Sequence, residues 1–232
     1  MPDITVTAAD GGTFSAYLAI AKGGKGPGVV VIQEIFGVNQ VMREMTDALA
    51  AQGYTAICPD LFWRQKPGIQ ITDKTKAEWD QAMGLMQGMD QDKAVEDLKS
   101  TLATLRKHPA CSGRAGTVGY CLGGRLAFMM ATRSDADCSV SFYGVMIDAL
   151  LGESRNIKHP LLMHIAEKDQ YVPPEAQTKI KEGLRTNSKV TMYTYKGADH
   201  GFARTGGVHF DKASADMANT RTSEFFKRNL AH

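Results

Sequence analysis

Short aliphatic and β-branched runs alternate along the chain with longer amphipathic segments, and this alternation constrains the fold more than any other feature. Apolar runs predict strands at Ile4–Thr7, Phe14–Ile20, Val29–Gln33, Thr55–Cys58, Ala115–Gly119, Ser139–Tyr143, Leu161–Ile165 and Val190–Tyr195. Helical spacing predicts helices at Val41–Gln52, Thr75–Gln87, Gln91–Lys107, Leu122–Thr132, Pro173–Leu184 and Phe210–Asn229. The alternation favours an α/β fold with a mostly parallel sheet and helices on both faces.

Glycine and proline indicate where several of these elements stop. Asp10-Gly11-Gly12 is typical of a hairpin turn between the first two strands. Gly53 follows the helix that begins at Val41 and is expected to cap its C-terminus. Leu61–Thr72 contains Pro67 and Gly68 and is expected to be a loop. We find no linker or internal repeat, so one domain over residues 1–232 is expected.

The composition excludes several classes of partner. The formal net charge is +2, from 27 basic and 25 acidic residues, which gives no reason to expect nucleic acid or a membrane surface as partner. The chain does not begin like a signal peptide, and its most apolar run, Val29–Ile32, is far too short to span a bilayer. The cysteines Cys58, Cys111, Cys121 and Cys138 form no paired motif, so reduced thiols and a cytoplasmic location are expected.

The strongest chemical signal is Gly119-Tyr120-Cys121-Leu122-Gly123-Gly124, which lies where a predicted strand meets a predicted helix. This is the nucleophile-elbow pattern, in which a strained turn presents the central side chain at the edge of the sheet. The helix N-terminus beside it favours a thiolate or an oxyanion. The motif alone is weak, because cysteine is also a common small core residue.

Two further residues complete the order nucleophile, acid, base. Asp169 follows the strand Leu161–Ile165, and His200 follows the strand Val190–Tyr195. Taken singly, Asp169 is explained as a loop cap before Pro173 and His200 as a surface histidine. Three residues in the α/β-hydrolase order at three strand ends are harder to explain by chance. A thiol with a pKa near ~8.5 needs such a base, and the carboxylate orients the imidazole.

Other candidate residues carry weaker signals. Glu34 follows a buried run at a strand end, where a carboxylate is out of place unless it is paired, although a surface position remains open. Arg204 lies four residues beyond His200 and is expected to line the same cleft, although a solvated loop arginine is the commoner case. His164 lies within a strand and is expected to be a packed core histidine. No metal-ligand spacing is present, and no cofactor is expected.

The chain resembles the dienelactone hydrolase family over nearly its whole length. The resemblance is carried by the segments 33–39 (QEIFGVN), 58–61 (CPDL), 119–124 (GYCLGG), 142–144 (FYG) and 200–206 (HGFARTG). A cysteine where most α/β-hydrolases have serine adds to it. The resemblance implies an α/β-hydrolase fold without a large cap domain, and cleavage of a lactone or carboxylic ester.

The resemblance also implies roles for individual residues. Cys121 would attack the carbonyl and form an acyl-enzyme, with His200 as base and Asp169 as the group that orients it. Glu34 would contact the thiol in the resting state and take part in its activation. Backbone N–H groups of Ile35 and Leu122 would form the oxyanion hole.

The substrate pocket implied by the resemblance contains Arg204 as the group that binds a substrate carboxylate, together with Phe36 and Tyr143. One departure concerns a second arginine of the family, whose place in the helix near Ala77–Met83 is taken here by Trp79. The nearby Met83 and Met86 also replace larger aromatic residues. Binding of the substrate carboxylate then depends on Arg204 alone, and the pocket is expected to be larger and more apolar.

The sequence therefore predicts a hydrolase of a small ester or lactone, and the implied role of Arg204 favours an anionic one. Two alternatives stay open: a carboxylesterase or thioesterase for more apolar acyl groups, and a non-catalytic α/β-hydrolase scaffold that binds a small molecule. The sequence is compatible with a monomer.

Overall fold

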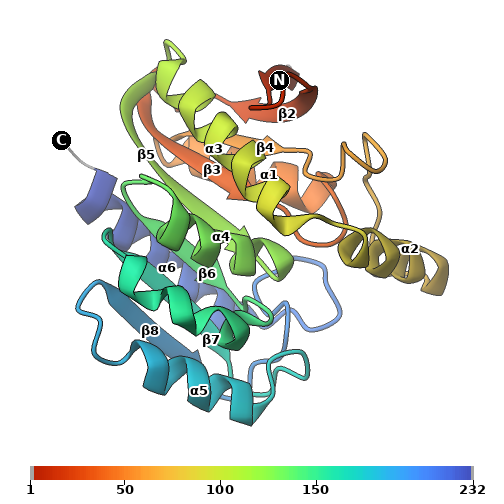
Figure 1. Cartoon of the computed structure of the whole chain (residues 1–232), viewed down its shortest axis with the longest axis vertical. Coiled ribbons are helices and arrows are strands. Elements are labelled where there is room, and N and C mark those ends of the chain that lie inside the picture. Colours follow the sequence, from red (N-terminus) through yellow and green to blue (C-terminus); the bar gives the residue numbers. More distant parts are fainter. Residues whose placement is uncertain (1–2, 231–232) are drawn as a thin grey trace. The chain divides into compact units, whose positions relative to one another are not determined.

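The computed structural model describes residues 3–230 (Figure 1). Its strands are β1 (Asp3–Thr7), β2 (Thr13–Ala19), β3 (Gly26–Ile32), β4 (Thr55–Pro59), β5 (Cys111–Tyr120), β6 (Ser139–Phe142), β7 (Leu161–Ala166) and β8 (Val190–Tyr195). Its helices are α1 (Gln40–Ala51), α2 (Lys76–Gln87), α3 (Gln91–Lys107), α4 (Leu122–Arg133), α5 (Pro174–Leu184) and α6 (Lys212–Leu230), with a 3-10 helix, η1, at Ile147–Asn156. The chain divides into two compact units, Met1–Thr117 and Val118–His232.

The first unit has the strand order β1-β2-β4-β3-β5. The hairpin β1–β2 turns at Gly11, whose φ of 88° is the left-handed conformation that the Asp-Gly-Gly sequence predicted. β2 pairs with β4 in antiparallel fashion, and β3 pairs with β4 in parallel. Residues 29–32 of β3 are fully buried, as expected for a strand between two covered faces.

The second unit continues with the end of β5 and then β6, β7 and β8. β6–β7 and β7–β8 are parallel pairs, so the carboxyl ends of these strands meet at one edge. All residues of β6 and β7 are buried, whereas β8 is largely part-exposed and is the last strand of the order. In Figure 1, α4 lies in front of β6 and α6 lies behind it.

His164 of β7 is buried, which confirms the expectation of a core histidine. Its Nδ1 lies 2.7 Å from the Tyr195 hydroxyl on β8, and its Nε2 lies 2.9 Å from the Thr222 hydroxyl on α6. Burial first, and then the positive charge of Arg221, lower the pKa of His164 to about 3. The neutral imidazole therefore joins two strands and a helix.

The structure differs from the sequence-based elements in several places. β3 begins at Gly26 rather than Val29, because Gly26, Pro27 and Gly28 lack the β-branched side chains by which the strand was predicted. β5 begins at Cys111 rather than Ala115; residues 112–114 are part-exposed or exposed and interrupt the apolar run from which the strand was predicted. η1 was not predicted; it buries only Ile147, so it leaves no amphipathic pattern in the sequence. The capping by Gly53 is confirmed: its φ is 98° and its N–H donates to Ala50 O.

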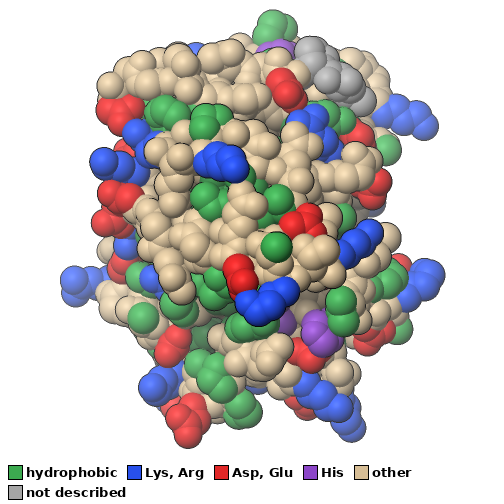
Figure 2. Space-filling model, turned by 90° about the vertical axis from the view of Figure 1, so that its right-hand side faces the viewer, with side chains coloured by type: hydrophobic (Ala, Val, Ile, Leu, Met, Phe, Trp, Pro, Cys, Tyr) green, Lys and Arg blue, Asp and Glu red, His purple; other side chains and the backbone are tan. Residues whose placement is uncertain are grey.

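The surface agrees with the balanced charge. Figure 2 shows acidic and basic side chains interspersed on the face that it draws, with small apolar areas between them. Within residues 3–230, no helix is both long enough and apolar enough to cross a membrane.

Candidate active site

Cys121 occupies the single residue between β5 and α4. Its backbone has φ 57° and ψ −116°, a conformation that is strained for a residue with a side chain. The turn is held by two hydrogen bonds: Cys121 N–H donates to Phe142 O at 3.1 Å, and Arg125 N–H donates to Cys121 O at 3.2 Å. The side chain is therefore fixed at the N-terminus of α4, as the elbow pattern predicted.

Glycines flank this turn because there is no room for a side chain. A Cβ atom on Gly119 would lie 1.9 Å from Gly123 O, and one on Gly124 would lie 2.5 Å from Phe142 O. Each contact is with backbone, which cannot move without disturbing the turn. The spacing of the motif thus has a steric cause in the structure.

Asp169 and His200 are paired in the interior of the second unit. His200 Nδ1 donates to Asp169 Oδ2 at 2.8 Å, and both residues are buried. The other carboxylate oxygen, Oδ1, accepts backbone N–H bonds from Tyr171 at 2.8 Å and Val172 at 3.2 Å. Asp169 is thus held on both sides and fixes the orientation of the imidazole.

His200 also hydrogen bonds to Cys121, so the three residues form one continuous series. Burial alone would lower the pKa of His200. The Cys121 charge and the hydrogen bonds to Asp169 and Cys121 outweigh it and raise the pKa to about 10. An imidazolium at neutral pH is the partner that stabilises a thiolate.

Two tyrosine rings contact the His200 imidazole. The Tyr143 ring lies 5.1 Å from it at 62°, and the Tyr171 ring lies 4.8 Å from it at 72°. Tyr143, at the end of β6, is buried and has a positive φ of 37°. Tyr171 was not among the sequence-predicted residues, although its position two residues after Asp169 was the signal that could have indicated it.

Arg204 lies in the same unit and is 8% exposed. Gly201, which has φ 78°, lies against it: a Cβ atom on Gly201 would be 2.9 Å from Arg204 Nη2. The positive charge of Arg204 acts to lower the pKa of Tyr171. The structure therefore places a buried guanidinium within electrostatic reach of a ring that touches His200.

The other site residues predicted from the sequence lie after β3, on α2 and at the start of α4. Glu34, Ile35 and Phe36 lie in the loop after β3, separated from the strand by Gln33, and are buried within the first unit. The Phe36 ring lies 5.6 Å from the ring of Trp79 on α2, so the structure brings these two predicted pocket residues together. Leu122 is the first residue of α4, where a backbone N–H has no partner within the helix.

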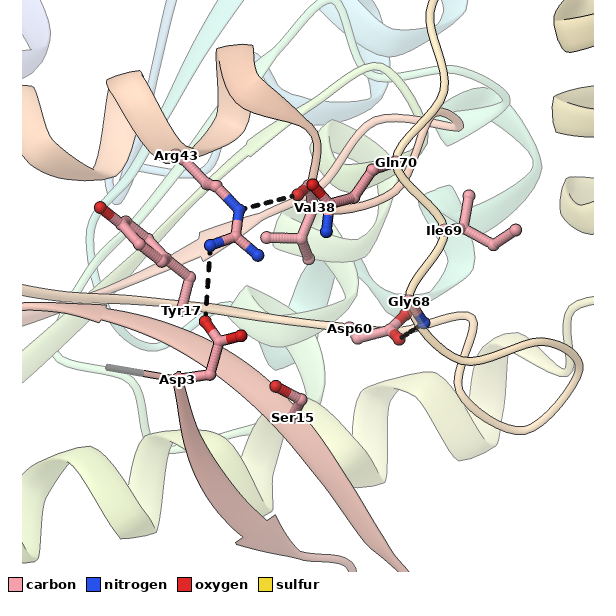
Figure 3. A pocket seen from close by; sticks show the side chains of 9 residues that line it. All are labelled: Asp3, Ser15, Tyr17, Val38, Arg43, Asp60, Gly68, Ile69 and Gln70. Atoms are coloured by element: carbon pink, nitrogen blue, oxygen red, sulfur yellow. Dashed lines mark hydrogen bonds and ion pairs between the residues drawn. The ribbon is translucent and has the colours of Figure 1, made fainter. Parts of the chain in front are cut away.

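A separate small cavity in the first unit has a structural explanation (Figure 3). Arg43 on its wall lies 3.5 Å from Asp3 and donates from Nε to Val38 O. Asp60 accepts the N–H of Gly68 at 2.7 Å. Arg43 and Asp60 thus each bond to other groups of the same wall. Among residues 3–230, no cluster of three or more metal-ligating side chains is present.

A known protein family matches nearly the whole chain. The model of the dienelactone hydrolase family matches residues 14–230. The chain is 56% identical to a "Putative carboxymethylenebutenolidase" of Azospirillum brasilense, covering 99% of this chain and 100% of that protein. It is 38% identical to a carboxymethylenebutenolidase of Pseudomonas putida, covering 96% of this chain and 94% of that protein.

Solved structures show the same fold. A "Putative Dienelactone Hydrolase" of Klebsiella pneumoniae has a TM-score of 0.87 at 24% identity and covers 98% of both chains. An esterase of Pyrococcus furiosus has a TM-score of 0.74 at 19% identity, covering 99% of this chain and 93% of that one. The fold is thus that of the α/β-hydrolases, as the sequence predicted.

Proposed function

Because the chain belongs to the dienelactone hydrolase family, we propose that it cleaves its ester or lactone substrate through a Cys121–His200–Asp169 triad and a covalent acyl-enzyme. That the chain is a hydrolase of small lactones or esters follows from the family itself. The triad is supported by one observation above all, the unbroken hydrogen-bonded series from Asp169 through His200 to Cys121.

In the proposed first step, the Cys121 sulfur attacks the carbonyl carbon while His200 holds the thiol proton. The carbonyl oxygen becomes an oxyanion, which the backbone N–H group of Leu122 at the start of α4 stabilises; the family resemblance implies Ile35 as the second donor. A donor of this kind lowers the barrier by about 3 kcal/mol, so the oxyanion hole contributes as much as the base. Glu34 takes part in activation of the thiol.

The intermediate then breaks its bond to the leaving oxygen, and His200 transfers its proton to that oxygen. The product of this half-reaction is a thioester on Cys121. A water molecule, deprotonated by His200, attacks the thioester carbonyl in the second half-reaction and releases the acid and the thiol. Asp169 stabilises the imidazolium in both halves.

The substrate is proposed to be a small anionic lactone of the dienelactone type, whose carboxylate Arg204 binds. The burial of Arg204 supports this role, because a guanidinium largely removed from water gains from an anionic partner. The alternative, a carboxylesterase or thioesterase for apolar acyl groups, is favoured by the Phe36–Trp79 aromatic pair at the place where the family has a second arginine.

Steady-state hydrolysis of cis- and trans-dienelactone and of neutral p-nitrophenyl esters tests the proposal. We expect a higher kcat/KM for the anionic lactones. Arg204→Ala should raise KM for the lactones at least about tenfold, the effect of one lost charged hydrogen bond, and change KM for neutral esters little.

The matched control is Arg185→Ala, which removes an exposed arginine from the same unit and should leave both substrate classes unchanged. Equal changes in KM for anionic lactones and neutral esters in Arg204→Ala would exclude Arg204 as the group that binds the substrate carboxylate. A wild-type preference for neutral esters would favour the alternative, and absence of turnover of every lactone and ester would refute the hydrolase mechanism.

A further inference from the structure

Tyr171 is an aromatic residue of the site that takes no part in the proposed triad mechanism. It lies in the loop after β7, two residues beyond Asp169, and its N–H donates to Asp169 Oδ1 at 2.8 Å. The backbone N–H of Tyr171 therefore bonds to the triad, while the residue as a whole is 42% exposed. An exposed ring on a fixed backbone is suited to contact a molecule that arrives from solvent.

The ring has a defined place relative to the base. It lies 4.8 Å from the His200 imidazole in an edge-to-face arrangement. Tyr143 also contacts this imidazole, but it is only 2% exposed. Of these two rings, Tyr171 is thus the one that solvent and an incoming substrate can reach.

The chemistry of acyl transfer shows which part of the substrate lies there. His200 Nδ1 is bonded to Asp169, so the proton for the leaving oxygen must come from Nε2. The leaving oxygen then lies within hydrogen-bond reach of Nε2, and the group attached to it extends alongside the imidazole. The acyl group, by contrast, is bonded to Cys121.

We propose that Tyr171 is a specificity-determining residue, whose ring contacts the leaving-group side of the substrate and selects planar, unsaturated or aromatic leaving groups. The inference rests on the proposed function, since it requires His200 to protonate the leaving oxygen. An offset or edge-to-face contact between a tyrosine and a conjugated leaving group is worth about 0.5–1.5 kcal/mol, roughly a 2- to 10-fold preference.

The charges around Tyr171 are compatible with a contact between its ring and the leaving group of the substrate. Burial first, then the negative charges of Cys121, Asp169 and Asp199, raise the pKa of the Tyr171 hydroxyl, and the positive charge of Arg204 opposes them. The phenol therefore stays neutral at the pH of the reaction. Contact through a neutral ring does not repel an anionic substrate, which Arg204 is proposed to bind.

Two ester series separate the leaving-group side from the acyl side. One series keeps the acetyl group and varies the alcohol from p-nitrophenol and phenol to ethanol. The other keeps p-nitrophenol and lengthens the acyl chain from acetyl to hexanoyl. The readout is kcat/KM of each variant divided by that of the wild type, which cancels the intrinsic reactivity of each ester.

Tyr171→Ala should lower this ratio about 2- to 10-fold more for aryl esters than for ethyl acetate, with equal ratios along the acyl series. Tyr171→Phe should keep the wild-type ratios, because it retains the ring. The control Met217→Ala, which truncates a similarly exposed apolar side chain on α6, should change neither series.

Three results would overturn the inference. Equal losses for every ester, accompanied by a shifted pH profile, would show that Tyr171 only positions His200. A loss that varies along the acyl series would place the ring on the other side of the substrate, and Tyr171→Phe behaving like Tyr171→Ala would exclude the ring contact. A wild-type enzyme that hydrolyses no ester would instead overturn the proposed function, and this inference with it.

Discussion

Cys121 combines a reactive group with an unfavourable backbone, and both follow from its place between β5 and α4. The φ of 57° is tolerated because Phe142 and Arg125 hold the peptide groups on either side, and because glycines leave space around the turn. Strain of this kind typically costs about 1–3 kcal/mol and persists where the surroundings enforce it. The elbow therefore depends on glycines that take no part in the chemistry.

Gly119→Ala tests this dependence. Its new Cβ would lie 1.9 Å from Gly123 O, so the turn must open, and we expect the free energy of unfolding to fall by at least about 2 kcal/mol with loss of esterase activity. Urea unfolding and kcat/KM measure the two effects. Gly84→Ala on α2 is the matched control: it meets nothing within 4 Å and should be neutral or stabilising. Equal stability of the two variants would contradict the steric account.

The same scale shows how much of the site the sequence could predict. Cys121, Asp169 and His200 were identifiable because each follows a predicted strand in a known order, and the structure brings the three together. Tyr171 was not, because its contact with His200 joins two loops that are distant in sequence. Hydrophobic periodicity predicts helices and strands, but it does not predict which side chains of different loops are in contact.

At the scale of elements, β7 connects the site to the body of the second unit. Its last residues lead to Asp169, and its buried His164 bonds to β8 and α6. The strand itself was predicted within one residue from its apolar run, and so was the burial of His164. The partners of His164 were not predictable, because Tyr195 and Thr222 lie on separate elements.

His164 makes the stability of these elements dependent on pH. Its pKa is about 3 in the folded chain and about 6.5 when unfolded, so the unfolded state binds the extra proton between these values. Stability should therefore fall as the pH decreases from 6.5 toward 3, by at most about 1.4 kcal/mol per pH unit from this group.

Urea unfolding at several pH values, compared between wild type and His164→Gln, measures this contribution. The wild type should lose stability more steeply on acidification than the variant. His159→Gln, which changes an exposed histidine, should follow the wild-type curve. Parallel curves for wild type and His164→Gln would exclude His164 as the source.

At the scale of the whole molecule, the fold class was predictable and some local contacts were not. The alternation of strands and helices was enough to predict the α/β class. Each element that is buried on one or both faces leaves a pattern of apolar residues in the sequence. The loop after β4 shows the limit. Trp63 and Arg64 both donate to the buried Asp97 of α3, a link that no local pattern indicates. Whether the two compact units act as the expected single domain stays a prediction.

The most direct test of the account is the kcat/KM of Cys121→Ala for p-nitrophenyl acetate and for dienelactone, beside wild type and Cys111→Ala. Cys111 is also buried but lies at the start of β5, outside the elbow. A covalent nucleophile predicts a loss of at least about a thousandfold for Cys121→Ala and wild-type rates for Cys111→Ala. A folded Cys121→Ala protein that retains kcat/KM within tenfold of wild type would contradict the account.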